Sequence, residues 1–179
     1  MAILRKILTV AVVCLTSIIV ATALARAGEE ATIEAFSAWV GQGQVMQTSP
    51  GEATFVGLLA GPFYINTEQG PVDAGSMVCP AVIRINLKDR TQSGSGDCTV
   101  TGEGGLKVFM ILNCKGVHLV GCAGDAKFTG GTGKFAGISG GGHFVIRSRM
   151  DDIISQADFT AKETGNGIIF WRELHYKIP

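Results

Sequence analysis

The sequence predicts an all-β fold, an antiparallel up-and-down barrel, and two observations carry that prediction. First, 25 of the 179 residues are glycine, and they recur every few residues between short apolar segments. This spacing is typical of short strands joined by tight turns rather than of helices. Second, two segments alternate between apolar and polar residues with the two-residue period of a strand. Closing such a meander into a barrel removes its exposed edges.

The first segment, residues 1–27, has the pattern of a cleavable secretory signal peptide. Arg5 and Lys6 give it a positive start, and residues 7–25 are uncharged and largely apolar. Residues 25–27 read Ala-Arg-Ala, which supplies the small side chains that signal peptidase requires. We therefore expect the signal to be removed after its last alanine.

Cleavage before Gly28 leaves residues 28–179, a length that suits a single domain with a hydrophobic core. We expect this domain to be periplasmic or secreted. It has 12 basic and 15 acidic residues and no basic run, so its charge gives no reason to expect a nucleic-acid partner. An uncleaved anchor is the alternative, because about 20 apolar residues span a bilayer. No later segment is apolar over such a length, so we expect no membrane span after cleavage.

Near the start of the mature chain, residues 30–40 are predicted to form a short helix. Ile33, Phe36 and Val40 share one helical face, and acidic residues precede them at the positive end of the helix dipole. The same residues could instead pair as a strand.

The clearest predicted strand covers residues 79–88, where one face is apolar and the other is polar. Its inward set is Cys79, Ala81, Ile83, Ile85 and Leu87. Residues 143–150 repeat the alternation, with Phe144 and Ile146 inward. The other predicted strands are 54–60, 63–67, 97–101, 106–114, 117–128, 157–162 and 168–177. Turn signals separate the predicted strands at 61–62, 69–71, 93–96, 104–105, 115–116 and 165–167.

The mature chain contains four cysteines: Cys79, Cys98, Cys114 and Cys122. An even number in an exported domain indicates two disulfides, but spacing alone does not choose among the three pairings. Strand parity favours Cys79–Cys98, because both side chains point inward on neighbouring strands. It favours Cys114–Cys122 across a turn. Each disulfide would contribute about 3 kcal/mol. No compact cluster of cysteine and histidine indicates a metal, and we expect neither a metal nor a cofactor.

Residues 128–140 read Phe-Thr-Gly-Gly-Thr-Gly-Lys-Phe-Ala-Gly-Ile-Ser-Gly. This is not a phosphate-binding loop, because Phe128 replaces its first glycine and Phe135 replaces the residue that would bind magnesium. The string resembles the Gly-Gly-Thr-Gly-x-Phe-x-x-x-x-Gly signature of the allene oxide cyclase and dirigent barrel superfamily, and the match is specific over about residues 121–146. The chain is also similar to an exported bacterial branch that shares the cysteines and the ending Trp-Arg-Glu-Leu-x-Tyr.

That resemblance implies an eight-stranded antiparallel barrel, often a homo-oligomer, whose interior holds apolar small molecules. The glycines of the string are expected to let the chain turn sharply and cross a barrel corner. The polar groups with which plant cyclases of the superfamily act on a fatty-acid epoxide have no counterpart that we can match here. No catalytic residue is therefore carried over.

Two polar residues fall on strand faces that are predicted to be inward. Arg172 shares its parity with Leu174, and an arginine at a barrel mouth would pair with a ligand carboxylate. His118 shares its parity with Cys122. The alternative is that Arg172 lies at the rim or on the outer face and that His118, which is close to a turn, is exposed. Two aromatic residues are added as candidate ligand contacts, although aromatic side chains more often belong to the core or the rim: Tyr64 and Tyr176.

The leading functional hypothesis is an exported barrel that binds an apolar or amphipathic small molecule. A cyclase or isomerase acting on a lipid-like or polyene substrate is the first alternative, and it predicts at least one buried titratable group with a shifted pKa beside the cavity. A solid barrel without a ligand is the second alternative. No Ser/His/Asp arrangement can be assembled from the spacing, so we lean against an enzyme.

Overall fold

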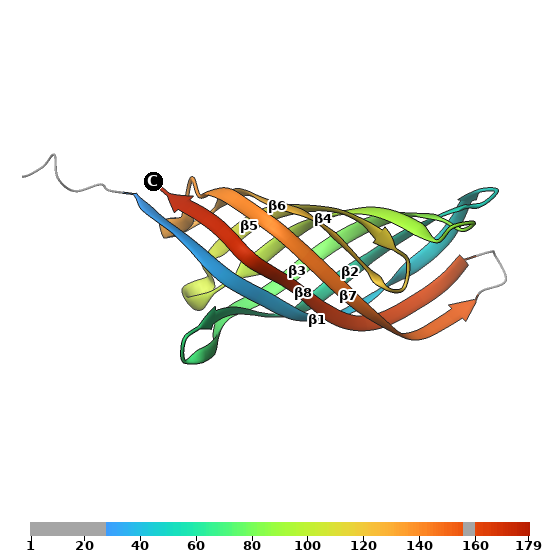
Figure 1. Ribbon diagram of the computed structural model, residues 1–179, viewed down its shortest axis with the longest axis horizontal. Coiled ribbons are helices and arrows are strands. Elements are labelled where there is room, and N and C mark those ends of the chain that lie inside the picture. Colours follow the sequence, from blue (N-terminus) through green and yellow to red (C-terminus); the bar gives the residue numbers. More distant parts are fainter. Residues whose placement is uncertain (1–27, 156–159) are drawn as a thin grey trace, which may run out of the picture. The chain divides into compact units, whose positions relative to one another are not determined.

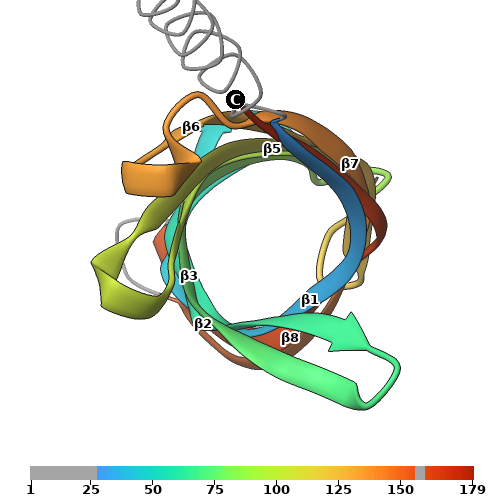
Figure 2. The same ribbon diagram turned by 90° about the vertical axis from the view of Figure 1, so that its left-hand side faces the viewer.

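The computed structural model describes residues 28–155 and 160–179, and the signal predicted at 1–27 lies outside them. Within the compact unit Glu30–Ile178, eight antiparallel strands pair in chain order and close into a barrel (Figures 1 and 2). The prediction of an all-β antiparallel barrel is confirmed. The strands are β1 (Glu29–Ser49), β2 (Glu52–Thr67), β3 (Gly70–Asn86), β4 (Thr91–Thr101), β5 (Lys107–Val117), β6 (Gly121–Gly131), β7 (Ser139–Ser155) and β8 (Thr160–Ile178).

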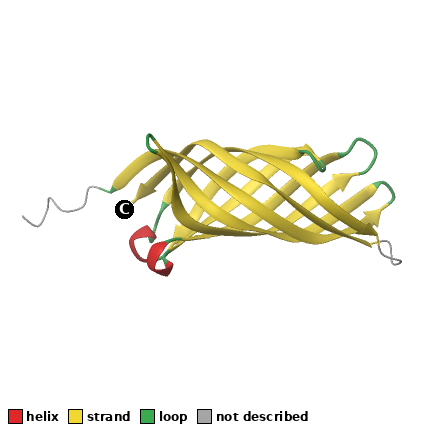
Figure 3. Cartoon of the chain, turned by 90° about the horizontal axis from the view of Figure 1, so that it is seen from below, coloured by secondary structure: helices red, strands yellow, loops and turns green. Residues whose placement is uncertain are grey.

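Two short 3-10 turns, η1 (Glu103–Gly105) and η2 (Gly133–Phe135), complete the described secondary structure. Figure 3 shows both at the end of the barrel where β8 terminates. No helix in the described part of the chain has the length and hydropathy of a membrane span.

The helix expected at 30–40 is wrong, because these residues belong to β1. Burial along β1 alternates with a period of two: Ala35 and Trp39 are buried, whereas Val40 is 69% exposed. β1 pairs with β2 from Glu34 to Ser49, so ladder hydrogen bonds and burial of one face override a weak helical pattern. Val40 therefore belongs to the outer face, opposite to its expected role.

The predicted inward faces of β3 and β7 are confirmed. Ile85 and Phe144 are 2% and 1% exposed, and Ile83 and Ile146 are partly buried against the interior. Leu87 differs from the expectation and is 50% exposed, because β3 ends at Asn86. The alternation therefore holds only as far as the ladder extends.

Several glycines that were expected in turns lie inside strands. The signals at 61–62, 93–96, 115–116 and 165–167 fall within β2, β4, β5 and β8, and the chain turns at 118–120 instead. At Gly61 an added Cβ would lie 2.0 Å from the carbonyl oxygen of Ala38 on β1. Glycine at such a position allows close approach of a neighbouring strand rather than a reversal of the chain.

The interior divides into two parts. We call the half of the barrel towards the end of β8 the filled half, because most of the larger core cluster packs there; the cluster continues to the edge of the other half at Trp39, Leu59 and Leu112. Trp171 is its centre, with ring centroids 5.8 Å from Phe63 and 6.0 Å from Phe144. Towards the turns that join β3 to β4 and β5 to β6, a smaller cluster gathers around Phe55 and Ile85. We call this the hollow half.

Two disulfides join neighbouring strands and are the pairs that parity favours. Cys79 on β3 bonds to Cys98 on β4, with their Cα atoms 4.1 Å apart. Cys114 on β5 bonds to Cys122 on β6, with Cα atoms 5.7 Å apart. Both links therefore connect inward positions of adjacent strands.

The burial pattern gives a direct stability prediction. We expect Phe144→Ala to lower the free energy of unfolding by about 3–5 kcal/mol, because it removes a fully buried ring. The matched control Val40→Ala, on the outer face, should change it by less than about 0.5 kcal/mol. Urea denaturation of the oxidised protein measures both values. Equal losses would contradict the assigned parity.

Candidate ligand-binding site

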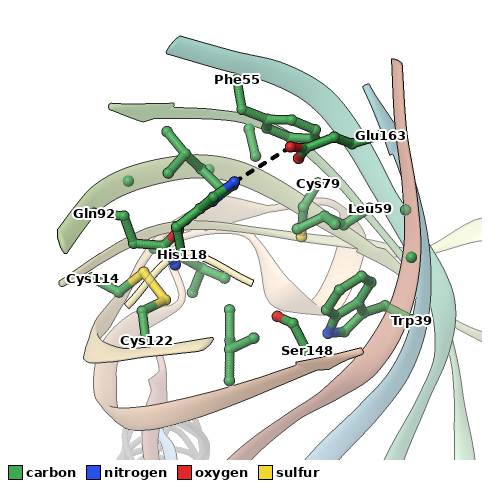
Figure 4. A pocket seen from close by; sticks show the side chains of 18 of the residues that line it. Trp39, Phe55, Leu59, Cys79, Gln92, Cys114, His118, Cys122, Ser148 and Glu163 are labelled. Atoms are coloured by element: carbon green, nitrogen blue, oxygen red, sulfur yellow. Dashed lines mark hydrogen bonds and ion pairs between the residues drawn. A yellow bond between two sulfur atoms is a disulfide. The ribbon is translucent and has the colours of Figure 1, made fainter. Parts of the chain in front are cut away.

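A cavity of about 110 Å³ lies in the hollow half of the barrel. All eight strands contribute to its wall, which is mostly apolar (Figure 4). Trp39 of β1, Phe55 and Leu59 of β2, Ile83 of β3 and Leu112 of β5 supply much of the apolar surface. The cavity is therefore the unfilled part of the common interior rather than a groove on the outside.

Small residues on the inward face explain why this part of the barrel is hollow. Gly94 and Gly96 of β4 and Ala81 of β3 line the cavity, and they carry little or no side chain. A Cβ added at Gly96 would lie 3.4 Å from the nearest atom, the carbonyl oxygen of Pro80, which is ordinary van der Waals contact. The interior next to Gly96 therefore has room for a side chain, and the backbone at this position tolerates one.

Other inward glycines instead make room for the aromatic rings of the wall. A Cβ at Gly43 or Gly57 would lie 2.4 or 2.3 Å from the ring of Phe55, and one at Gly167 would lie 2.6 Å from the indole of Trp39. Glycine at these positions therefore leaves room for the two rings, which a side chain would displace.

Three polar side chains meet at the cavity wall. His118 follows β5, and its Nδ1 lies 3.2 Å from Oε1 of Gln92 on β4. Its Nε2 lies 3.3 Å from Oε1 of Glu163 on β8. The side chains of His118 and Glu163 are only 17% and 7% exposed (Figure 4). A carboxylate and an imidazole are therefore held together next to an apolar space.

The backbone of two turns positions His118. Its N–H donates to the carbonyl oxygen of Arg90, at 2.9 Å, which ties the β5–β6 turn to the β3–β4 turn. Leu119 and Arg90 both adopt positive φ, at 66° and 59°. This conformation costs a residue with a side chain about 1 kcal/mol, so both turns are held by their surroundings. The Cys114–Cys122 disulfide joins the two strands of the same hairpin, β5 and β6.

A further hydrogen bond orients Gln92. Its Nε2 donates to the carbonyl oxygen of Gly121, at 3.4 Å, so its Oε1 faces His118. Both ring nitrogens of His118 therefore have a partner, Gln92 on one side and Glu163 on the other.

Trp39 adds an unsatisfied donor to the cavity wall. Its side chain is buried, and Nε1 finds no acceptor among the described residues. Figure 4 shows this nitrogen on the edge of the ring that faces the pocket, on the side of Ser148. A buried donor without a partner costs about 1–3 kcal/mol, and Nε1 of Trp171, outside the cavity wall, carries the same cost.

Of the residues singled out in the sequence, His118 lines the cavity. Tyr64 lies on the outer face of β2, where its ring stacks on Phe36 with centroids 5.1 Å apart. Tyr176 is partly buried against the core of the filled half. Neither tyrosine is part of the cavity wall.

The inward orientation expected for Arg172 is wrong. Ile169 and Trp171 are the buried residues of this part of β8, and Arg172 is exposed. The pairing of β8 with β7 then shifts between Trp171 and His175, so Arg172 and Glu173 both face outward before Leu174 turns in. Because of this bulge, the inward positions are odd-numbered up to Trp171 and even-numbered from Leu174 onward. The sequence predicts one uninterrupted alternation through this region.

Sequence reasoning missed Trp39, Gln92, Ser148 and Glu163. A signal existed for Ser148, which shares the inward parity of Phe144 and Ile146 on the predicted strand 143–150. No comparable pattern marked the others: Trp39 fell in the predicted helix, and Glu163 fell between predicted strands. Among the described residues, no cluster of His, Cys, Asp and Glu is able to hold a metal ion.

The fold and the site define a closed eight-stranded antiparallel β-barrel with a cavity in one half of its interior. No family model matches the sequence, and no curated protein matches it. Among solved structures, the chain is similar to a pterocarpan synthase dirigent protein at 11% sequence identity and a TM-score of 0.32, over 81% of this chain and 93% of that one. These values do not assign the chain to a family.

A double-mutant cycle tests whether burial strengthens the His118–Glu163 contact. We expect a coupling free energy of about 2 kcal/mol from the alanine variants, because both groups are largely shielded from water. The control is the His143–Asp125 pair, which has the same 3.3 Å separation but side chains 65% and 86% exposed. Its coupling should stay below about 1 kcal/mol. Equal couplings, measured by chemical denaturation, would contradict the shielding.

Proposed function

We propose that this chain is an exported barrel that binds a small apolar or amphipathic molecule in its interior. The cavity carries the proposal, because its wall is mostly apolar with a few convergent polar groups, as in ligand sites generally. Its 110 Å³ is smaller than the roughly 150 Å³ cavity known to bind benzene, and well below the roughly 300–1,000 Å³ typical of drug-sized ligands. The enclosed part of the ligand is therefore at most about the size of one ring.

Export is the second part of the proposal. Two disulfides support it, since such links persist in oxidising compartments. The signal pattern at 1–27 supplies the route. We expect the intact mass of protein purified from the periplasm or medium to correspond to a chain that starts at Gly28 and is two disulfides oxidised. A cytoplasmic protein with its first 27 residues intact would overturn this part.

We further propose membership of the allene oxide cyclase and dirigent barrel superfamily, in its exported bacterial branch, on the glycine string at 130–140. In the barrel this string ends β6, forms η2 and begins β7. Gly133 and Gly140 have positive φ, and a Cβ at Gly140 would lie 2.3 Å from the carbonyl oxygen of His175. The string thus shapes a corner, and it supports the architecture rather than a particular ligand.

Filling the cavity tests the binding function. We expect wild-type protein, purified from its own compartment, to retain a small molecule that native mass spectrometry detects. Gly96→Leu should abolish retention, because the new side chain occupies the space in front of β4. Asp97→Leu is the matched control, since it places the same side chain on the outer face of β4.

Circular dichroism checks that both leucine variants keep the barrel. Equal retention by Gly96→Leu and wild type would place the ligand outside the cavity. Absence of retained mass in the wild type, together with no affinity for added apolar probes, would support the solid barrel instead.

The His118–Glu163 pair favours a second candidate, a cyclase or isomerase that acts on a lipid-like or polyene substrate. A buried carboxylate that is hydrogen-bonded to an imidazole beside an apolar space is the arrangement that general acid–base catalysis requires. If the barrel is such an enzyme, Glu163→Gln should reduce turnover at least about 100-fold. Arg172→Ala, on the outer face, should leave turnover unchanged.

A further inference from the structure

We propose that the side chains of His118 and Leu119 form a gate at the entrance of the cavity, and that the His118–Glu163 contact is the latch that holds the gate closed. This inference rests on the proposed binding function and concerns how a ligand reaches the same cavity. The gate lies in the turn between β5 and β6, and the latch joins that turn to β8 (Figure 4).

The described part of the barrel leaves one direction for entry. All eight strands pair into a closed ring, so the wall has no open edge. The filled half is closed by packed side chains, with Trp171 and Leu174 only 0% and 1% exposed. A ligand therefore reaches the cavity through the hollow half, where the β3–β4 and β5–β6 turns lie.

The two gate residues lie at the boundary between the cavity and solvent. Leu119 lines the cavity and is nevertheless 39% exposed. His118, the preceding residue, also lines the cavity, and its side chain keeps some contact with water. Both residues therefore have the cavity on one side and solvent on the other.

The latch spans the opening of the barrel rather than two paired strands. Glu163 belongs to β8, whose neighbours in the ring are β7 and β1, whereas His118 follows β5. The contact between Nε2 of His118 and Oε1 of Glu163 is thus made across the interior. Without it, the described partner that remains for the imidazole is Gln92, which lies on the same side of the entrance as His118.

The gate opens by rotation of side chains, because the backbone of the turn is held at both ends. The N–H of His118 donates to the carbonyl oxygen of Arg90. The N–H of Ser148 donates to the carbonyl oxygen of Val120, at 3.0 Å. Free side chains at a protein surface change rotamer within nanoseconds, so breaking the latch is the step that limits entry.

A latch and a contact with the ligand differ in their kinetic signatures. Loss of a contact between ligand and wall changes mainly the dissociation rate. Loss of a latch lowers the barrier to entry as well as to exit, so it raises the association rate too. The association rate constant is therefore the decisive quantity.

Exchange spectroscopy by ¹⁹F NMR, with fluorobenzene as the probe, measures both rates. We expect His118→Ala and Glu163→Ala each to raise the association rate about tenfold, because each removes the latch hydrogen bond. Glu163→Gln keeps a hydrogen-bonding partner for His118 and should raise the rate less. In the wild type, the association rate constant should stay below about 10⁷ M⁻¹s⁻¹, whereas an open site reaches about 10⁸–10⁹ M⁻¹s⁻¹.

Two controls separate the latch from other effects. His143→Ala removes an exposed pair of the same 3.3 Å separation, His143–Asp125, and should leave both rates unchanged. Ile83→Val trims the cavity wall on β3, so it should alter the dissociation rate and leave the association rate unchanged.

Each failure has its own signature. If fluorobenzene does not bind the wild type, the proposed function fails. If it binds, but both latch variants associate at the wild-type rate or the wild type already associates as fast as an open site, the cavity is a ligand site and the gate is overturned. Should one alanine variant not fold, the other variant and the wild-type rate decide the question.

Discussion

Closure of the barrel is the constraint on which the rest of the structure depends. Once eight strands pair in a ring, every inward side chain shares one interior of fixed width. Side chains at the same height along the barrel axis share one cross-section, so bulky residues there must face small ones. Trp171 and Phe144 use the space in the filled half, whereas Gly94 and Gly96 leave it open in the hollow half. The cavity is thus a consequence of which residue sizes occupy the inward positions.

The polar groups of the site depend on the same closure. Gln92 and His118 come from neighbouring strands, because Gln92 on β4 pairs with Gly116 at the end of β5. Glu163 comes from β8, which does not pair with β4 or β5, so it meets His118 only across the closed interior. Exclusion of water makes their mutual hydrogen bonds stronger and makes an unpaired member costly. The wall therefore pairs the carboxyl group of Glu163, while the indole of Trp39 keeps an unused donor.

The sequence predicted the features that depend on neighbouring residues along one strand. The alternation in 79–88 and 143–150 identified the inward faces of these strands, because a pleated strand places every second residue on one side. The same parity, read on the neighbouring segment 97–101, paired Cys79 with Cys98. The helix at 30–40 and the inward Arg172 failed for long-range reasons. Pairing with β2 converts the first segment to a strand, and a bulge against β7 turns Arg172 outward. Glu163 escaped notice because its partner is 45 residues away.

The two disulfides are large enough in energy to offset the cost of the hollow half. At about 24 cal/mol per Å³, a cavity of 110 Å³ removes about 2.6 kcal/mol of packing stability. One disulfide contributes about 3 kcal/mol by restricting the unfolded chain, so a single cross-link offsets a cavity of this size. Cys79, Cys114 and Cys122 all belong to the cavity wall, so both cross-links reach the region where packing is weakest. A barrel stabilised in this way keeps an open interior without filling it with side chains.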